Sequence, residues 1–306
     1  MIRFTKMQGI GNDYIYIDGF DAGMLSEIDD PAALAIAMSD RHTGVGGDGL
    51  ILILPPDDPA RADARMRMFN ADGSEAEMCG NGIRCVCKYA RDHGLTEANP
   101  MRVETGAGVL SLAYALDAEG LVERVTVDMG EPILSLPAIP VRESELAWSV
   151  GANHGIEFDD ACWIGVFVSM GNPHVVLFKD EHPELMSGTL EDLDLARWGP
   201  RLERHPAFPQ RINTHFAEVR ARGEVAMRTW ERGAGMTQAC GTGACAVCVA
   251  GALTGRTNRE VLVHLPGGDL ELRWDETSKH VFMSGPAVEV FEGEWRAAEK
   301  ESGVRI

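Results

Sequence analysis

The architecture of this chain can be read from one segment, Arg228-Thr-Trp-Glu-Arg-Gly-Ala-Gly-Met-Thr-Gln-Ala-Cys240-Gly-Thr-Gly-Ala-Cys-Ala-Val-Cys-Val-Ala-Gly251. Its residues predict a strand, then a glycine-rich turn, and then an alanine-rich helix with Cys240 at its start. An earlier segment repeats this order: Arg67-Met-Phe parallels Arg228-Thr-Trp, and Cys79-Gly-Asn-Gly parallels Cys240-Gly-Thr-Gly. Both matches are 161 residues apart, which indicates two copies of one design.

Further matches follow in the same order along the chain. Gly11-Asn12 recurs as Gly171-Asn172, and Val103 through Leu110 resembles Val263 through Leu270, each 160 residues apart. Ordered self-similarity of this kind is the signature of duplication. We therefore predict a mixed α/β fold with mostly antiparallel strands and two pseudo-symmetric domains, each with strands wrapped around a central helix. The predicted domains are residues 1–130, completed by a C-terminal strand within 286–306, and residues 131–285, with an active site in the cleft between them.

Local signals define several helices. Asp30-Pro31 opens one that extends through Arg41, because Asp caps a helix well and Pro fits its first turn. The helices that start near Cys79 and Cys240 are predicted to end near His93-Gly94 and near Gly255.

The segment Gly44-Val-Gly-Gly-Asp-Gly49 matches the dinucleotide-binding pattern Gly-x-Gly-x-x-Gly. In that pattern the glycines follow a strand and open a helix, whereas here they follow a helix and precede the strand Leu50 to Leu54. We interpret the segment as a tight helix-to-strand loop and not as a nucleotide site.

Composition excludes other classes of function. The net charge is −19, and no basic patch interrupts it, which argues against nucleic-acid binding. No apolar run approaches the roughly 20 residues that span a bilayer, and the N-terminal residues lack an apolar signal core, so we expect a cytoplasmic protein without a membrane partner. Seven cysteines in such a chain predict reduced thiols.

Two of these cysteines differ from the rest. Cys85, Cys87, Cys162, Cys245 and Cys248 are best explained as packing residues, because free cysteine is among the most buried residue types. Cys79 and Cys240 each precede Gly-x-Gly at a helix N-terminus, where unpaired backbone N–H groups can hold a carboxylate or a thiolate. One such cysteine in each half suits a reaction in which two sulfurs approach one carbon from opposite sides, as racemases and epimerases require.

A different class of function also fits part of the pattern. Cys240, Cys245 and Cys248 match the first three ligands of a plant-type iron–sulfur site, although no cysteine follows Cys248 and a helix there would replace the required loop. A thiol-based metal or redox protein is therefore an alternative.

The motifs together resemble those of the diaminopimelate epimerase family over nearly the whole chain. They are Met7-x-Gly-x-Gly-Asn-Asp13, Arg41-His-x-Gly-x-Gly-x-Asp48, Phe69-Asn-Ala-Asp-Gly-Ser-Glu75, Cys79-Gly-Asn-Gly-x-Arg84, Met170-Gly-Asn-Pro-His174 and Glu231-Arg-Gly-Ala-Gly-x-Thr-Gln-Ala-Cys-Gly-Thr-Gly-Ala244. The resemblance implies interconversion of LL- and meso-diaminopimelate by two bases, without pyridoxal phosphate or metal, in lysine and peptidoglycan precursor biosynthesis.

The same resemblance implies roles for individual residues. Cys79 and Cys240 would be the acid–base pair, and His174 and Glu231 would tune the thiols. The substrate would be bound by Asn12, Asn70, Gly80, Asn81, Asn172, Asn213, Glu231, Arg232, Gly241 and Thr242, with the residues of the two Gly-x-Gly motifs holding its α-carboxylate through backbone N–H groups.

One position departs from the family pattern. Some members place a substrate-contacting Gln directly after the Asp of the Arg-His motif, and here that residue is Gly49. A related amino-acid racemase of the proline racemase type is therefore a second alternative. We expect a small-molecule substrate and no cofactor, and a homodimer is one option for the assembly.

Overall fold

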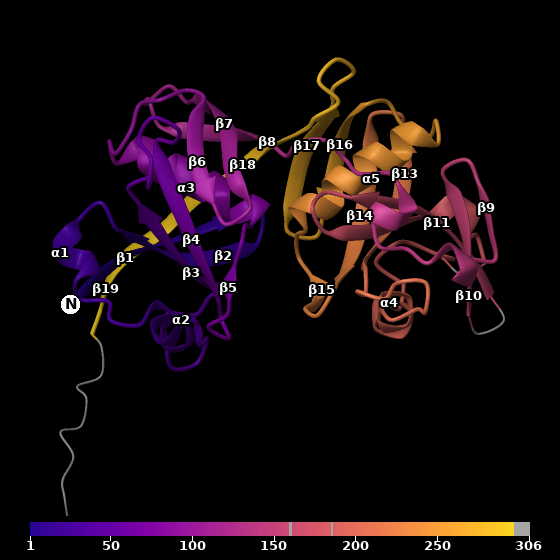
Figure 1. The fold of residues 1–306 in the computed structure, drawn as a ribbon, viewed down its shortest axis with the longest axis horizontal. Coiled ribbons are helices and arrows are strands. Elements are labelled where there is room, and N and C mark those ends of the chain that lie inside the picture. Colours follow the sequence, from indigo (N-terminus) through magenta and orange to yellow (C-terminus); the bar gives the residue numbers. More distant parts are fainter. Residues whose placement is uncertain (159–160, 185, 297–306) are drawn as a thin grey trace, which may run out of the picture. The chain divides into compact units, whose positions relative to one another are not determined.

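The computed structural model describes residues 1–158, 161–184 and 186–296, which form two compact units (Figure 1). The first unit contains residues 1–123 and the C-terminal segment that starts at Ala287, and the second contains Arg124–Pro286. The sequence predicts boundaries after residues 130 and 285, and the two units of the structure divide after residues 123 and 286. The part of the predicted C-terminal strand beyond residue 296 lies outside the described residues.

Seven strands of the first unit pair in the order β19-β1-β2-β3-β4-β6-β7. Only the pairs β2–β3 and β4–β6 are parallel among these. The strands are β1 (Ile2–Gly9), β2 (Asn12–Asp18), β3 (Gly49–Leu54), β4 (Ala64–Asn70), β6 (Met101–Thr105), β7 (Gly108–Leu116) and β19 (Val288–Trp295), and the short β5 (Glu75–Ala76) adds to β4. The helices are α1 (Ala22–Leu25), α2 (Pro31–Ser39) and α3 (Gly80–Asp92).

The second unit repeats this topology. Its strands β11-β12-β13-β14-β16-β17 pair in the same order and orientations as β1-β2-β3-β4-β6-β7, including the parallel pairs β12–β13 and β14–β16. The bounds are β9 (Trp148–Val150), β10 (Asn153–Phe158), β11 (Ala161–Ser169), β12 (Pro173–Phe178), β13 (Asn213–Ala221), β14 (Glu224–Glu231), β15 (Gly235–Thr237), β16 (Glu260–Leu265), β17 (Gly268–Trp274) and β18 (Val281–Pro286), with the helices α4 (Leu195–Glu203) and α5 (Gly241–Leu253). The strand β8 (Val122–Asp128) begins in the first unit, continues into the second and pairs with β18. The predicted mixed, mostly antiparallel α/β fold is thus confirmed.

One helix occupies the centre of each unit. The helix α3 contacts β1, β2, β3, β4 and β7, and α5 contacts β11, β12, β13, β16, β17 and β18. Figure 1 shows each of these helices among the strands of its own unit. Both helices have 13 residues, and each is followed by a glycine at φ +71°, Gly94 and Gly255, where the left-handed conformation ends the helix.

Each unit has its own hydrophobic core. The first core is mainly aliphatic and includes Ile15, Ile17, Leu50 and Leu52. The second contains aromatic side chains, among them Trp163, which lies edge-on to the ring of Trp198. Among the described residues, no helix is both long enough and apolar enough to cross a membrane.

Candidate active site

Both predicted cysteines are the N-cap residues of the central helices. Cys79 precedes α3 with φ −134° and ψ 118°, and Cys240 precedes α5 with φ −131° and ψ 102°. In this extended conformation a cap side chain faces the unpaired N–H groups of the first helical turn. The Sγ of Cys79 accepts a hydrogen bond from Gly82 N at 3.4 Å, and the Sγ of Cys240 lies 3.7 Å from Thr242 Oγ1.

The second glycine of each Gly-x-Gly motif permits close packing below the cysteine. A Cβ at Gly82 would lie 2.8 Å from Ile51 Cδ1, and a Cβ at Gly243 would lie 2.2 Å from His215 Cε1. At Gly243 the buried His215 ring leaves no room for a side chain, whereas at Gly82 the end of the Ile51 side chain would have to shift.

A chain of side-chain hydrogen bonds surrounds the start of α3. Asn81 Nδ2 donates to Asn12 Oδ1, and Asn12 Nδ2 donates to Asp48 Oδ2 at 3.1 Å. The buried guanidinium of Arg84 donates to Asn81 Oδ1 at 2.9 Å and to Gly80 O at 3.2 Å. Two predicted site residues, Asn12 and Asn81, are therefore in direct contact in the first unit.

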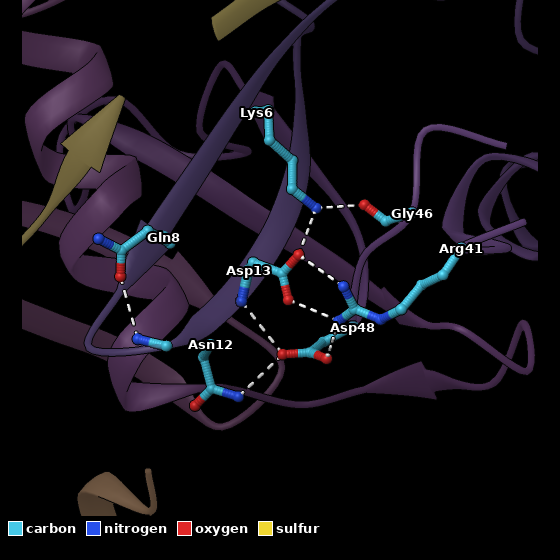
Figure 2. A network of polar contacts seen from close by, with 8 residues as sticks. Lys6, Gln8, Asn12, Asp13, Arg41, Gly46 and Asp48 are labelled. Atoms are coloured by element: carbon cyan, nitrogen blue, oxygen red, sulfur yellow. Dashed lines mark hydrogen bonds and ion pairs between the residues drawn. The ribbon is translucent and has the colours of Figure 1, made fainter. Parts of the chain in front are cut away.

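A charged network continues from Asn12, as Figure 2 shows. Arg41 donates to both carboxylate oxygens of Asp13 and, at 2.9 Å, to Asp48 Oδ1. Lys6 forms an ion pair with Asp13 at 2.6 Å and also donates to Gly46 O. Burial opposes ionisation of Asp13, but the hydrogen bonds from Arg41 and Lys6 prevail and lower its pKa.

A different chain surrounds the start of α5 in the second unit. Asn172 Nδ2 lies 3.4 Å from Thr242 Oγ1, and Asn172 Oδ1 lies 2.8 Å from His174 Nε2. His174 Nδ1 lies 2.8 Å from His215 Nε2, and His215 Nδ1 lies 3.0 Å from Thr229 Oγ1. An amide oxygen only accepts, so the Nε2 of His174 carries its proton. By the same logic His215 Nε2 donates to His174, and the Thr229 hydroxyl donates to His215.

Burial keeps both histidines neutral. It lowers the pKa of His174 well below its usual value, with contributions from His215 and Arg232, and it lowers the pKa of His215 to about 3. Burial also raises the pKa of Cys240, and the charge of Glu231 adds to this effect. The Thr242 hydroxyl and the Gly243 N–H oppose the increase, since both stabilise a thiolate.

The remaining predicted residues of the second unit lie at the ends of neighbouring strands. Asn213 starts β13, donates to Pro173 O at 2.9 Å and accepts from Arg232 N at 2.9 Å. Glu231 ends β14 and accepts from Thr237 Oγ1 at 2.6 Å. The side chain of Arg232 is exposed and reaches Gln210 O.

Asn70 lies at the end of β4 in the first unit, where its amide donates to Ser74 Oγ at 2.9 Å. The departure at Gly49 has a structural cause in the neighbouring strand. Gly49 pairs with Asn70, and a Cβ on it would lie 2.2 Å from Phe69 O. Any side chain at this position would displace β4, so a Gln could not be added here without other changes.

The packing interpretation of the other cysteines holds with one exception. Cys85, Cys87, Cys245 and Cys248 are buried, and burial raises the pKa of Cys85 to about 11 and those of Cys87 and Cys248 to about 12. Cys162 is exposed, so its prediction as a packing residue was wrong. It alternates with the buried Trp163 on β11 and therefore faces the opposite side of the strand.

The cysteines of α5 do not form a cluster suited to metal. Cys240 caps the helix, whereas Cys245 and Cys248 lie within it and are fully buried. In the part of the chain that the structure describes, one group of potential ligands lies close together, namely His93, Glu289 and Glu292, and it contains no cysteine. The geometry therefore gives no support to an iron–sulfur site on this helix.

Several residues around the cysteines were missed or left without a role in the sequence analysis. Arg41 and Asp48 belong to one of the quoted motifs, but the motif does not show that Asp48 contacts Asn12 or that Arg41 holds Asp48. His215 and Thr229 lie on strands β13 and β14, whose pairing joins them, and they carry no local sequence signal.

Comparisons with known proteins give one consistent result. A family model described as diaminopimelate epimerase matches residues 4–135 and 166–290. A protein of Desulfovibrio desulfuricans named diaminopimelate epimerase is 52% identical over 297 residues, covering 96% of this chain and 98% of the relative. A protein of the same name from Acetivibrio thermocellus is 49% identical over 293 residues, with 96% and 98% coverage.

Solved structures with low sequence identity share the fold. A phenazine biosynthesis protein of the PhzF family from Bacillus anthracis has a TM-score of 0.65 at 19% identity and covers 97% of this chain and 99% of its own. A probable proline racemase from Agrobacterium radiobacter has a TM-score of 0.63 at 14% identity, with coverage of 99% and 95%.

Proposed function

Because the chain belongs to the diaminopimelate epimerase family and is therefore an epimerase of the isomerase class, we propose that it interconverts LL- and meso-diaminopimelate with Cys79 and Cys240 as acid and base. The observation that carries this proposal is the equivalent placement of the two cysteines. Each caps the buried central helix of its own unit and faces that helix's first turn. We place the reaction in lysine and peptidoglycan precursor biosynthesis, as the family resemblance implies.

Inversion of a carbon requires proton removal on one face and proton delivery on the other. A thiolate takes the α-proton, the C–H electron pair passes into the α-carboxylate as the carbanion forms, and the opposite thiol returns a proton to the carbon. The thiolate and thiol have then exchanged places, so the reverse reaction uses the same two groups. The proton balance closes with the two sulfurs alone.

The helix N-termini supply the electrostatic part of this mechanism. Backbone N–H groups at Gly80, Asn81, Gly241 and Thr242 belong to the first turns of α3 and α5, where anions bind favourably. They would stabilise the carboxylate as it gains charge, and they would stabilise each thiolate. A helix terminus contributes about 0.3–1 kcal/mol at an exposed site and up to ~2 kcal/mol when partly buried.

The distal end of the substrate carries a second ammonium and a second carboxylate. Neutral amides both donate and accept hydrogen bonds, and Arg binds carboxylates in a two-pronged fashion. Asn213 and Arg232 supply this combination in the second unit, where the Arg232 backbone N–H already donates to Asn213 Oδ1. Asn12, Asn70, Asn172 and Glu231 complete the proposed binding set.

Deuterium exchange tests the proposal directly. Purified protein in D2O with LL-diaminopimelate should incorporate deuterium at the α-carbon and form the meso isomer, as followed by proton NMR and chiral chromatography. The same assay with L-proline should show no exchange, because proline lacks the distal ammonium and carboxylate that the proposed binding set recognises. Exchange at proline without exchange at diaminopimelate would overturn the assignment of substrate.

Cysteine variants test the mechanism. Replacing Cys79 or Cys240 with Ala should abolish epimerisation, because each removes one of the two proton carriers. Cys85→Ala and Cys248→Ala, at buried positions on the same two helices, should retain turnover. Full activity in either of the first two variants would refute the two-thiol mechanism.

A further inference from the structure

The orientation of the Asn12 amide is fixed by charge at both ends of its hydrogen-bond chain. Arg84 can only donate, so the oxygen of Asn81 faces it and the nitrogen of Asn81 faces Asn12. At the other end the carboxylate of Asp48 can only accept, so Asn12 must turn its nitrogen toward Asp48. If either amide turned by 180°, a donor would face a donor at one of its contacts or an acceptor would face an acceptor.

The carboxylate of Asp48 is in turn held from several sides. Its Oδ2 also accepts from Asp13 N at 3.1 Å, and its Oδ1 accepts from Arg41. Its own backbone N donates to Asp13 O at 2.7 Å. Arg41 is locked by two bonds to Asp13, which Lys6 also contacts. The loop between Gly44 and Gly49, which resembled a nucleotide motif, thus places one carboxylate against Asn12 (Figure 2).

We propose that Asp48 is a positioning residue for substrate recognition, acting through the orientation that it imposes on Asn12. This inference rests on the proposed function, because it takes Asn12 as a substrate contact. An Asn amide has two hydrogens and two oxygen lone pairs. Among the described residues these hydrogen bonds use one hydrogen and one lone pair of the half-buried Asn12. The other N–H and the other lone pair point in defined directions and suit the ammonium and carboxylate groups of an amino acid.

The second unit holds the equivalent asparagine with uncharged groups. Asn172 contacts His174 and Thr242, where Asn12 contacts Asp48 and Asn81. Among the described residues a charged side chain therefore contacts this asparagine in the first unit only, so the substitutions that test it are made there.

Two matched substitutions separate positioning from general loss of structure. In Asp48→Asn the oxygen is retained toward Arg41, so the new NH2 faces two donors, Asn12 Nδ2 and Asp13 N. Asn12 must then rotate or withdraw. Asp13→Asn removes the same charge from the same network at a residue whose side chain does not touch Asn12. We expect KM for diaminopimelate to rise about tenfold or more in Asp48→Asn, the equivalent of one good hydrogen bond, and clearly less in Asp13→Asn.

The melting temperature of the variant Asn12→Asp gives a readout that is independent of activity. Asn12→Asp places a carboxylate 3.1 Å from Asp48 Oδ2, which raises the pKa of the pair. The other charged groups that face this pair are Arg41, Lys6, Asp13 and Arg84, and all are unchanged. A raised folded-state pKa gives stability that is present at low pH and lost as pH rises. The melting temperature of Asn12→Asp should therefore fall relative to wild type between pH 5 and pH 8.

The double variant Asn12→Asp with Asp48→Asn should remove that pH dependence, because it restores one carboxylate and one amide. An Asn12→Asp melting curve that follows wild type across this range would overturn the inference, as would equal KM values in Asp48→Asn and Asp13→Asn. Failure of the wild-type protein to epimerise diaminopimelate would refute the proposed function but leave the pH test of the Asn12–Asp48 contact valid.

Discussion

The buried histidine pair makes the hydroxyl of Thr229 a critical donor. His215 Nδ1 accepts from this hydroxyl, and no other contact of that nitrogen occurs among the described hydrogen bonds. In Thr229→Val the nitrogen would be buried without a partner, at a cost of about 1–3 kcal/mol in the free energy of unfolding. Thr229→Ser retains the hydroxyl and should lose much less.

A neighbouring residue provides the control. Thr214 is also fully buried, and its hydroxyl has no hydrogen-bond partner within the described part of the chain. Thr214→Val should therefore be neutral or slightly stabilising, because it removes an unsatisfied polar group. Urea unfolding of the three variants measures the differences, and equal losses in Thr229→Val and Thr214→Val would contradict a hydrogen bond between Thr229 and His215.

The sequence could predict which cysteines start helices but not what supports them. Cys79 and Cys240 were found because short-range signals, a turn followed by Gly-x-Gly, surround each one. Asp48, in the loop before β3, contacts Asn12 because β3 pairs with β2, and Thr229 contacts His215 because β14 pairs with β13; the partners are 36 and 14 residues apart. Such contacts leave no local pattern. Cys162 was misassigned because its neighbour Trp163, and not the cysteine, takes the inward-facing position.

Among the secondary-structure elements, those with strong caps were predicted best. The helix α2 has Asp30 as its cap, with the side chain accepting from Ala32 N and Ala33 N, although it ends at Ser39 and not at Arg41. The helices α3 and α5 begin and end as the cysteine and glycine signals indicate. The hairpin of β9 and β10 was not predicted. The strand Trp148–Val150 is short and exposed, and its sequence shows no clear alternation of apolar and polar residues.

The strand β3 provides a prediction at this scale. Its first residue, Gly49, lies too close to Phe69 O for any Cβ, so Gly49→Ala should separate β3 from β4 at the end that carries Asn70. Overpacking of this kind costs about 1–3 kcal/mol. Gly223→Ala is the control, because a Cβ at Gly223 meets nothing within 4 Å. Far-UV circular dichroism during urea unfolding compares the two, and an equally small effect would show that β4 moves freely.

At the scale of the whole molecule, the two units should differ in how their stability responds to acid. Burial lowers the pKa of four histidines, His154, His174, His182 and His215, and all four belong to the second unit. Lowered carboxylate pKa values occur in both units, for example at Asp13 and Asp63 in the first and at Asp192 in the second, so the histidines are what distinguishes the units. Histidines and carboxylates lose their contributions to the free energy of unfolding in different pH ranges. A pH titration can therefore distinguish the effect of the second unit's histidines from that of the carboxylates.

A histidine whose folded-state pKa is lowered binds its proton more readily in the unfolded chain. Its contribution to stability is complete above the unfolded pKa, about 6.5, and is lost as pH falls below it. Each fully buried histidine then costs up to about 1.4 kcal/mol per pH unit. Carboxylates with lowered pKa lose their contribution only as pH falls through about 4. Between pH 6.5 and pH 4.5, destabilisation should therefore be concentrated in the second unit.

Tryptophan fluorescence can report this difference. Trp148, Trp163, Trp198, Trp230 and Trp274 lie in the second unit, and Trp295 lies in the first, so the variant Trp295→Phe confines the signal to the second unit. Its urea midpoint should fall steeply from pH 7 to pH 5. Hydrogen–deuterium exchange of backbone amides, measured in one sample for peptides from α3 and α5 and corrected for intrinsic exchange rates, provides the comparison. From pH 7 to pH 5, protection should decrease in α5 and change little in α3. Equal losses in the two helices would mean that the units unfold together or that the buried histidines do not govern acid stability.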